Sequence, residues 1–478
     1  MTDIRPLVRP LGVIACTALV MGNMIGSGIF LLPASLAPYG WNGVAGWVLT
    51  IGGSLALAYC IARLAAIRSE RQDPPGLVEA AFGRTTGFAV GWSYWVSIWT
   101  ANAAISIAGV SYLSLFFPAL KHPGIGAAVA IALVWLVTFV NLAGARAAGG
   151  LQIVTLLLKL MPLAAVLIIA AWALGTGHAP QADFSPSGLK FASINAAAAL
   201  TLWAMLGFES AACVAAKARD PQRTVPRATV IGTIATGLLY LLVCTAITQL
   251  LPASVVQGSD APFADFVSHF IGWGPAYVVG AFAAISAIGA LNGWTLLQGE
   301  IPLAMAQRGE LPAWFARTDP RGTPARALVF SSVLISLLLV INSLKTLSEL
   351  FVFMILLSTS AALWMYLGCA AAALRLRVAM PVAALGTAYA LWTLWGAGLN
   401  ASALSLALMI AGLPVYYWSR PQPSPVRAAQ ARAPEESGCA CAGRTNAGTP
   451  RSCRADPSRN CVTPCPAARA RSARCPPR

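Results

Sequence analysis

The sequence Gly22-Asn23-Met24-Ile25-Gly26-Ser27-Gly28 interrupts the first long apolar stretch of the chain, at residues 11–33. A second interruption, Trp203-Ala204-Met205-Leu206-Gly207-Phe208-Glu209-Ser210, lies midway in the apolar stretch at 193–216. Glycine and small polar residues in the middle of an apolar stretch favour a helix that is broken at that point. Each interrupted stretch opens a block of five apolar stretches. The sequence therefore predicts two broken helices, helix 1 and helix 6, in corresponding positions.

The composition places both breaks in a membrane. The chain has 478 residues, of which 58% are hydrophobic and 10% charged, and its mean hydropathy is +0.70. Charged residues make up about a quarter of a soluble domain. The composition therefore excludes a soluble enzyme, a secreted disulfide scaffold and a wholly disordered chain, and makes the lipid bilayer the expected partner. The sequence contains neither a metal-ligand cluster nor a catalytic triad, so we expect no enzymatic activity, no metal and no cofactor.

Twelve apolar stretches approach the roughly 20 residues that a spanning helix needs. They lie at 11–33, 42–67, 85–117, 124–143, 150–174, 193–216, 227–251, 272–305, 327–343, 347–373, 379–398 and 400–418. Backbone polar groups in hydrocarbon must be satisfied within the segment, so we expect an all-α membrane protein with twelve transmembrane helices. The first stretch is too long for a cleavable signal and lacks a cleavage site, so we expect it to remain as helix 1.

The basic residues predict the orientation of these helices. Eighteen fall on the side of the N-terminus, between Arg5 and Arg420, and three on the opposite side, Lys121, Lys190 and Lys345. Cytoplasmic loops carry an excess of Lys and Arg, so we expect both termini, including residues 1–10, to be cytoplasmic in a bacterial inner membrane. This bias explains the net charge of +16 without nucleic acid as a partner.

Residues 421–478 differ from the twelve-helix domain at 11–420. They contain ten Arg, ten Pro and six of the eleven Cys, and almost no large apolar residue. Such a segment cannot bury a core, so we expect it to be disordered. It contains no His and no paired C-x-x-C, which argues against a zinc module. Its composition equally fits a translated frameshift, and we assign it no function.

The paired breaks indicate an inverted-repeat transporter. Backbone amides freed at a break form a positive helix end that can hold a substrate carboxylate. For Gly26-Ser27-Gly28 alone, close helix packing through small residues is the alternative. The second break, at Gly207, favours the transporter.

Five motifs connect this pattern to a known family: Gly22 to Pro33, Tyr94 through Asn102, Trp203 to Ser210, Gly293 to Leu297, and Gly322-Thr323-Pro324. They resemble the amino acid–polyamine–organocation superfamily, and within it the basic amino acid/polyamine antiporters, nearest the bacterial arginine/agmatine branch. The resemblance covers residues 10–418. It implies a LeuT-like 5+5 inverted repeat and the exchange of an arginine-like amino acid for its agmatine-like amine. It leaves the oligomeric state open, with a homodimer among the alternatives.

The same resemblance implies roles for individual residues. Asn23, Met24, Ser27 and Gly28 would receive the α-carboxylate and α-amino groups, and Trp203 would stack on the aliphatic stem. Ser97, Ile98 and Asn102 would surround the guanidinium, and Leu206, Trp294 and Ser358 would complete the pocket. Tyr94, Glu209 and Tyr366 would close an outer gate by hydrogen bonding.

The spacing of Tyr94, Ser97, Ile98 and Asn102 supports these roles independently, because i, i+3, i+4 and i+8 share one helix face. Three polar side chains on one face of a spanning helix require a bundle interior, although interhelical hydrogen bonding without a ligand would also explain them. Trp203 and Trp294 fall near helix centres, away from the interfacial belts. Glu209 is an intramembrane carboxylate, which favours function; a structural anchor for the broken helix is the alternative.

Lys159 is a basic residue inside the predicted span at 150–174. It could extend its ammonium to the membrane surface. Proton-coupled relatives in the superfamily have a lysine in helix 5 whose ammonium stands in for a sodium ion, whereas the nearest antiporters lack it. A proton-coupled importer of amino acids or polyamines is therefore the alternative function. The segment Pro74 to Glu79 lacks the family's tyrosine linked to pH response, so acid activation is not implied.

Overall fold

A computed structural model describes residues 12–26, 28–67, 73–122, 124–143, 158–178, 186–213 and 218–419. The chain divides into two units, Met1–Pro421 and Gln422–Arg478, and every described residue belongs to the first. Ser27, residues 1–10 and the segment 421–478 lie outside the described residues. The predictions made for them remain predictions.

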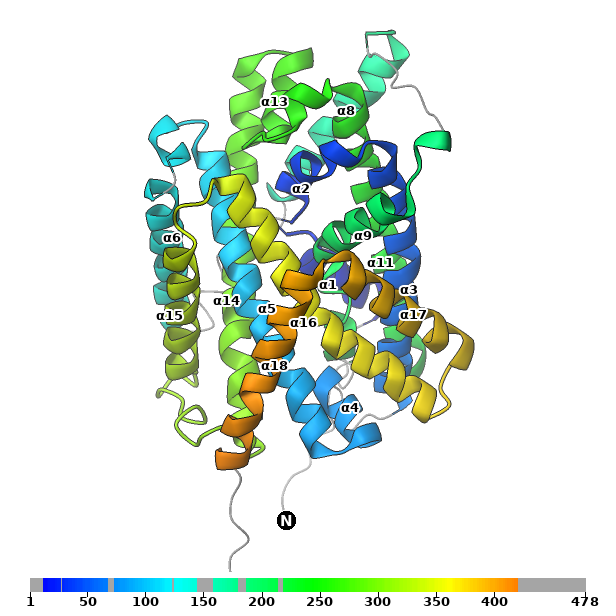
Figure 1. The fold of residues 1–478 in the computed structure, drawn as a ribbon, viewed down its shortest axis with the longest axis vertical. Coiled ribbons are helices and arrows are strands. Elements are labelled where there is room, and N and C mark those ends of the chain that lie inside the picture. The colour runs from blue at the N-terminus through cyan, green and yellow to red at the C-terminus, as the bar shows by residue number, and fades with distance from the viewer. Residues whose placement is uncertain are drawn as a thin grey trace, which may run out of the picture. The chain divides into compact units, whose positions relative to one another are not determined.

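The described residues form helices joined by turns, without a β-strand among them. In chain order the α-helices (Figure 1) are α1 (Val13–Met24), α2 (Gly28–Leu36), α3 (Trp41–Ile67), α4 (Pro74–Phe82), α5 (Arg84–Leu113), α6 (Ile125–Leu142), α8 (Leu160–Gly175), α9 (Phe191–Met205), α10 (Ser210–Cys213), α11 (Pro221–Leu250), α12 (Ala253–Val256), α13 (Pro262–Phe270), α14 (Trp273–Gln307), α15 (Ala325–Ile341), α16 (Leu347–Arg375), α17 (Met380–Gly396) and α18 (Leu399–Ser419). Short 3-10 turns occupy Ala37–Tyr39, Pro118–Lys121 and Pro186–Gly188.

Each of the twelve predicted stretches contains a helix. Within the described part of the chain, seven helices are long and apolar enough to cross a membrane, or up to eight if the bent pair of α1 and α2 counts as one span. Three shorter apolar helices are α8, α9 and α15. The all-α membrane class is thus confirmed, whereas twelve spans and the 5+5 repeat remain predictions. The beginning of the stretch at 150–174 lies outside the described residues.

Both predicted breaks are present. The first apolar stretch bends by 52° between its two helical parts, at residues 25–27. In the sixth stretch α9 ends at Met205 and α10 begins at Ser210. Gly207, between them, has a φ of +110°, a conformation that only glycine adopts without strain.

Helix α5 lies at the centre of the bundle and contacts both α14 and α16 along its length (Figure 1). It is buried nearly throughout. Small residues allow other helices to approach closely: a β-carbon on Gly46 of α3 would lie 2.9 Å from Ala197 Cβ of α9. The residues on α5 are therefore held between fixed neighbours.

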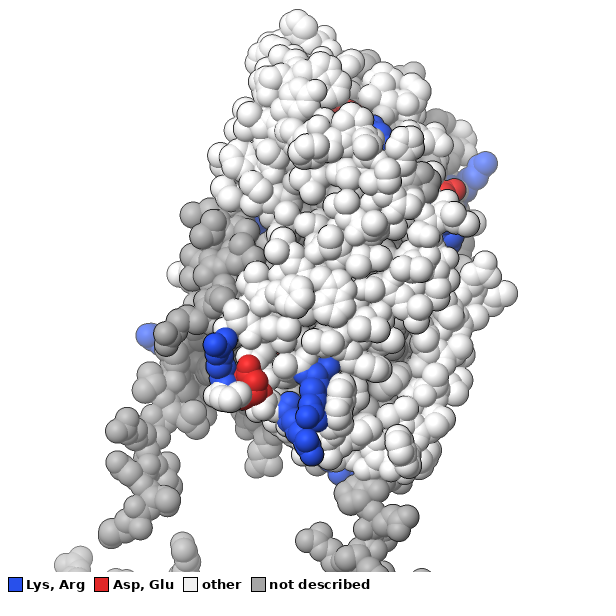
Figure 2. Space-filling view, turned by 90° about the vertical axis from the view of Figure 1, so that its left-hand side faces the viewer, with Lys and Arg blue, Asp and Glu red and all other residues white. Residues whose placement is uncertain are grey.

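The end of the bundle that holds Arg84, Arg308 and Arg375, called the arginine-rich end below, also holds α4. Arg84 Nη2 donates to the Arg308 carbonyl at 3.4 Å, and the Arg375 guanidinium lies over the Phe82 ring of α4. Figure 2 shows the most prominent Lys and Arg side chains of one face near its lower end, with smaller blue areas near the upper end and the edges. The gathering at the lower end agrees with the positive-inside prediction, and the orientation itself remains predicted.

Candidate functional site

The two helix breaks touch each other. Asn23 Nδ2 donates to Ser210 Oγ at 2.6 Å, and Ser210 Oγ donates to the Gly207 carbonyl at 2.5 Å. A β-carbon on Gly207 would lie 3.1 Å from the Asn23 carbonyl carbon. Tyr240 Oη donates to the Met24 carbonyl at 2.8 Å, which satisfies one acceptor freed where α1 ends. The residues at the two breaks therefore form a hydrogen-bonded junction between α1, α9 and α10.

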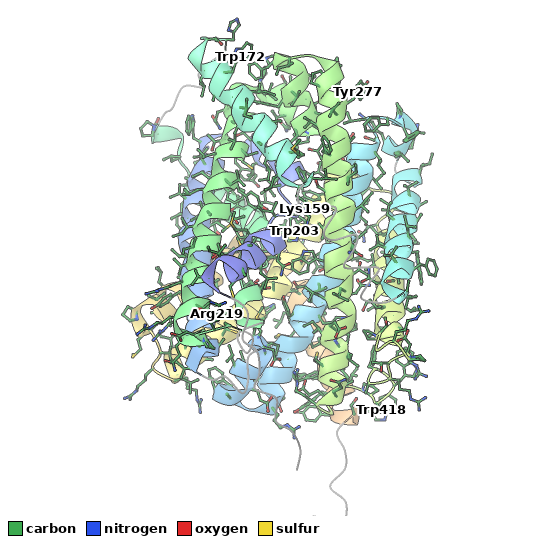
Figure 3. All side chains as sticks on the ribbon, turned by 180° about the vertical axis from the view of Figure 1, so that it is seen from behind. Lys159, Trp172, Trp203, Arg219, Tyr277 and Trp418 are labelled. Carbon is green, nitrogen blue, oxygen red and sulfur yellow. The ribbon has the colours of Figure 1, made fainter. Side chains whose placement is uncertain are left out.

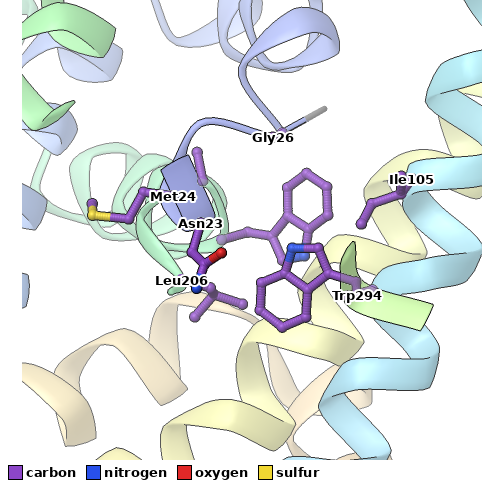
Figure 4. Close-up of a pocket in the computed structure, with 10 residues that line it drawn as sticks. Asn23, Met24, Gly26, Ile105, Leu206 and Trp294 are labelled. Carbon is purple, nitrogen blue, oxygen red and sulfur yellow. The ribbon is translucent and has the colours of Figure 1, made fainter. Parts of the chain in front are cut away.

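A narrow pocket of about 20 Å³ lies at this junction. It is lined by Asn23, Met24, Gly26, Gly28, Ala101, Ile105, Trp203, Ala204, Leu206 and Trp294. Figure 4 shows the Trp294 indole reaching from α14 toward Asn23 and Leu206. Six of the eleven predicted substrate-binding residues therefore come together here: Asn23, Met24, Gly28, Trp203, Leu206 and Trp294.

Trp203 is a buried wall of this pocket. Its side chain is 5% exposed, and its ring meets Phe351 of α16 edge to face at 5.4 Å. Its Nε1 has no hydrogen-bond partner in the described part of the chain. An indole face in a desolvated pocket can hold a cation and its alkyl stem. This position differs from the interfacial position of membrane-belt tryptophans.

The predicted residues on α5 lie beside the pocket. Ser97, Ile98 and Asn102 are buried, and none belongs to the lining of the narrow pocket. Ser358 Oγ donates to the Ser97 carbonyl at 2.9 Å, and Asn102 Nδ2 donates to Gln298 Oε1 at 2.6 Å. Interhelical hydrogen bonding thus explains part of this face.

Two polar atoms on this face of α5 stay unexplained by interhelical contacts. Ser97 Oγ and Asn102 Oδ1 are buried and have no hydrogen-bond partner among the residues that the structure describes. Buried polar atoms are nearly always paired with protein or water, so an unpaired acceptor next to a pocket fits a ligand. Ala101 and Ile105, on either side of Asn102, line the narrow pocket.

The predicted gate residues form one hydrogen-bonded group around Glu209, which is 3% exposed. Tyr94 Oη donates to Glu209 Oε1 at 2.6 Å, and Tyr366 Oη donates to Oε2 at 2.9 Å. The Gly207 amide also donates to Oε2, at 3.2 Å. The carboxylate therefore anchors the break of helix 6 and joins it to α5 and α16.

This group lies on the arginine-rich side of the pocket. Along α5, Tyr94 stands between Arg84 and Ser97, and along α16, Tyr366 stands between Ser358 and Arg375. In the predicted orientation that side is the inner one. The expectation of an outer gate and the predicted orientation therefore disagree, because helix direction determines which side each tyrosine occupies, and both remain predictions.

A larger cavity of about 430 Å³ adjoins the junction. Its lining includes Asn23, Glu209 and Trp294 at the breaks, and Asp73, Pro74 and Pro75 at the arginine-rich end. The cavity thus connects the two regions.

Lys159 also lines the larger cavity. It precedes α8, is 2% exposed, and lies midway along the bundle (Figure 3). The alternative in which Lys159 extends to the membrane surface is contradicted, because its side chain is buried and lines the cavity together with Gly22 and Asn23.

Sequence reasoning missed an ion-pair cluster at the arginine-rich end of this cavity. Arg308 Nε and Nη2 bind the two Glu310 carboxylate oxygens at 3.0 and 3.1 Å, and Nη1 binds Asp73 Oδ2 at 3.0 Å. Burial raises the pKa of Glu310, and the hydrogen bonds from Arg308 oppose that rise. The only signal in the sequence was a loop Arg308-Gly309-Glu310, whose partner Asp73 is remote in the chain.

The family model described as amino acid permease matches residues 11–425. The cadaverine/lysine antiporter of Escherichia coli (strain K12) is 36% identical over 70% of this chain and 76% of that protein. The putrescine transporter PotE of Haemophilus influenzae is 31% identical, over 71% and 77%. The putative arginine/ornithine antiporter of Bacillus subtilis is 32% identical, over 66% and 74%. This chain, a multi-pass membrane transporter of amino acids or amines, belongs to the amino acid permease family of the amino acid–polyamine–organocation superfamily.

Proposed function

We propose that this permease exchanges a cationic amino acid for its decarboxylated amine across a bacterial inner membrane, with arginine and agmatine as the pair. The observation that carries the proposal is the narrow pocket, which has two indole rings and no carboxylate in its lining. A cation over an aromatic face gains about 0.5–1 kcal/mol when exposed and about 2 or more when desolvated. Contact of that strength allows both capture and release, which exchange requires.

The two ends of an amino acid would bind at different parts of the site. The amides at the start of α2, at Gly28, suit a carboxylate because a helix N-terminus is positive. The side chain would lie along Trp203, with its cationic end near Ser97 Oγ and Asn102 Oδ1, two buried atoms of α5 that have no partner among the described residues. An amine lacks the carboxylate and would be held by the second set of contacts alone. Ser27, expected among the first set, lies outside the described residues.

Lysine and cadaverine are the pair to compare with arginine and agmatine. The relative at 36% identity is a cadaverine/lysine antiporter, and another is a putative arginine/ornithine antiporter. Both pairs present the same chemistry, a cationic end on an alkyl stem. The motifs Trp203, Asn102 and Trp294 favour arginine, and a direct comparison of affinities ranks the two pairs.

We place Tyr94, Glu209 and Tyr366 as a gate between the pocket and the arginine-rich end. Three hydrogen bonds to one buried carboxylate hold α5, α16 and the helix 6 break together. Charge-assisted hydrogen bonds are the stronger kind. Breaking them would separate these elements and let substrate pass toward Asp73.

Proton-coupled import is the second candidate, and Lys159 is the observation that favours it. Its ammonium is enclosed in the cavity next to the break of helix 1. When Lys159 is protonated, its positive charge stabilises the junction. Deprotonation removes this charge. Such an element can couple transport to a proton gradient.

Calorimetric titration of the detergent-purified protein tests the substrate class. The ligands are L-arginine, agmatine, L-lysine and cadaverine, with L-citrulline as a neutral analogue of arginine. We expect the cationic ligands to bind at least about 10-fold more tightly than citrulline, which corresponds to ~1.4 kcal/mol. Equal affinity for arginine and citrulline would contradict the proposal.

A further inference from the structure

Gln298 lies between Asn102 and helix α15, fully buried on α14. Its Oε1 accepts the hydrogen bond from Asn102 Nδ2 at 2.6 Å. Its Nε2 donates to Ser332 Oγ at 3.0 Å and lies 3.4 Å from the Leu328 carbonyl oxygen, which it also faces. The side chain thus connects the proposed site to the backbone of α15.

The α15 end favours one direction for this chain of hydrogen bonds. A carbonyl oxygen can only accept, so the Leu328 carbonyl offers no donor to Gln298. The single proton of the Ser332 hydroxyl has two other acceptors nearby, the Leu328 carbonyl at 2.9 Å and Thr138 Oγ1 at 2.8 Å. An amide turned the other way would place Oε1 against the Leu328 carbonyl oxygen. Gln298 therefore presents Nε2 to α15 and Oε1 to Asn102, and Asn102 donates from its Nδ2.

This hydrogen bonding gives the Asn102 side-chain amide one orientation, in which its oxygen is an acceptor beside the pocket. With Nδ2 committed to Gln298, Asn102 Oδ1 is left buried and unpaired. A buried acceptor without a partner is costly unless a ligand supplies the donor. Its neighbours on α5, Ala101 and Ile105, line the narrow pocket.

We infer that Gln298 is a positioning residue for charge selection: it holds the Asn102 amide so that Oδ1, and not the NH₂ group, meets the cationic end of the substrate. The inference rests on the proposed function and names the device that selects a cation there. A freely rotating Asn102 could turn its NH₂ group toward the ligand. In that orientation the NH₂ group of Asn102 could donate to the neutral ureido carbonyl of citrulline. It would repel the guanidinium of arginine, which also carries only donors.

The test compares L-arginine with L-citrulline by competition binding in Gln298→Met, which keeps the length of the side chain and removes its acceptor. We expect the Kd for arginine to rise roughly 10- to 100-fold, the range for a hydrogen bond to a charged group. The Kd for citrulline should change less than about 3-fold. Since Gln298 acts through Asn102, the double variant Asn102→Ala/Gln298→Met should bind arginine like Asn102→Ala alone.

Asn141→Leu is the matched control, because Asn141 Nδ2 makes another buried amide contact with α14, to Asn292 Oδ1 at 3.0 Å. It should leave the arginine-to-citrulline ratio unchanged. If Gln298→Met does not fold, Ser332→Ala removes the partner of Nε2 and should lower the ratio by a smaller factor.

Equal losses for both ligands, or additive effects in the double variant, would reduce Gln298 to a packing residue and overturn the inference. An effect of Asn102→Ala without one of Gln298→Met would overturn the inference and leave the proposed function standing. Unchanged arginine binding in Asn102→Ala would overturn both the inference and the placement of the cation at Asn102.

Discussion

The ring of Trp203 lies directly against Gly28, so closely that a β-carbon at residue 28 would stand 2.9 Å from Cζ3 of the indole. Gly28 begins α2, and Trp203 lies in the last turn of α9. The contact therefore sets the position of the indole relative to the helix 1 break. Residue 28 must be glycine because a side chain there would occupy the space that the Trp203 ring fills.

Gly28→Ala should displace this ring and weaken substrate binding. Forcing an extra methyl into a packed site costs roughly 1–3 kcal/mol, so we expect the Kd for L-arginine to rise about 10-fold. Gly26→Ala is the matched control in the same break, because its β-carbon would meet Ala290 Cβ at 3.5 Å, an ordinary contact. Calorimetric titration measures both variants. Equal affinities in the two would show that the Trp203 position does not matter for binding.

The variant Trp203→Leu distinguishes stacking of the substrate on the indole face from a role of Trp203 in packing alone. Loss of a desolvated cation–π contact and of part of the buried stem should cost about 1–3 kcal/mol of arginine affinity, or roughly 5- to 150-fold in Kd. Trp203→Phe should recover much of this, since a smaller aromatic face remains. Trp99→Leu, at a buried tryptophan outside the linings of both central cavities, should have little effect. Unchanged affinity in Trp203→Leu would remove the residue from the site.

Tyr366→Phe should loosen the proposed gate. It removes one hydrogen bond from Glu209, and a bond to a charged group contributes about 1.5–3 kcal/mol. We expect uncoupled leak of preloaded agmatine from proteoliposomes to rise about 10-fold while the Kd for arginine stays constant. Tyr112→Phe breaks a comparable buried bond, to the Phe30 carbonyl at 2.7 Å, and should not increase the leak. If the leak of agmatine does not increase in Tyr366→Phe, Glu209 is a structural anchor and not part of a gate.

Lys159→Met keeps most of the side-chain volume and removes the charge. If the ammonium substitutes for an ion between helices 5 and 1, transport should fall at least about 10-fold without a lower melting temperature. Lys159→Arg, which keeps the charge, should retain part of the activity. A fully active Lys159→Met would eliminate the ion-substitute role and with it the main support for proton coupling.

The helices and both breaks could be predicted from the sequence because each depends on a local property. Apolar length defined the twelve stretches that contain helices, and glycine at residues 26, 28 and 207 marked the breaks. Trp203, Trp294 and Glu209 could be predicted because an aromatic or charged residue near a helix centre is conspicuous in an apolar chain.

The partners of these residues could not be predicted. Asn102 and Gln298 are separated by 196 positions, and their contact depends on the rotation of α14 against α5. The pairing of Asp73 with Arg308 across 235 positions likewise depends on how α4 packs. The side of the gate also depends on the direction in which α5 and α16 run, which the residue roles implied by the resemblance do not contain.

Counterflow in proteoliposomes tests the central proposal, exchange of a cationic amino acid for its amine, most directly. Labelled L-arginine is supplied outside vesicles that contain agmatine, arginine or no substrate, and a parallel series uses L-lysine with cadaverine. We predict that uptake requires an internal cationic substrate and is about 10-fold or more above that of empty vesicles. Equal uptake into empty vesicles under an imposed proton gradient would contradict exchange and establish proton-coupled import.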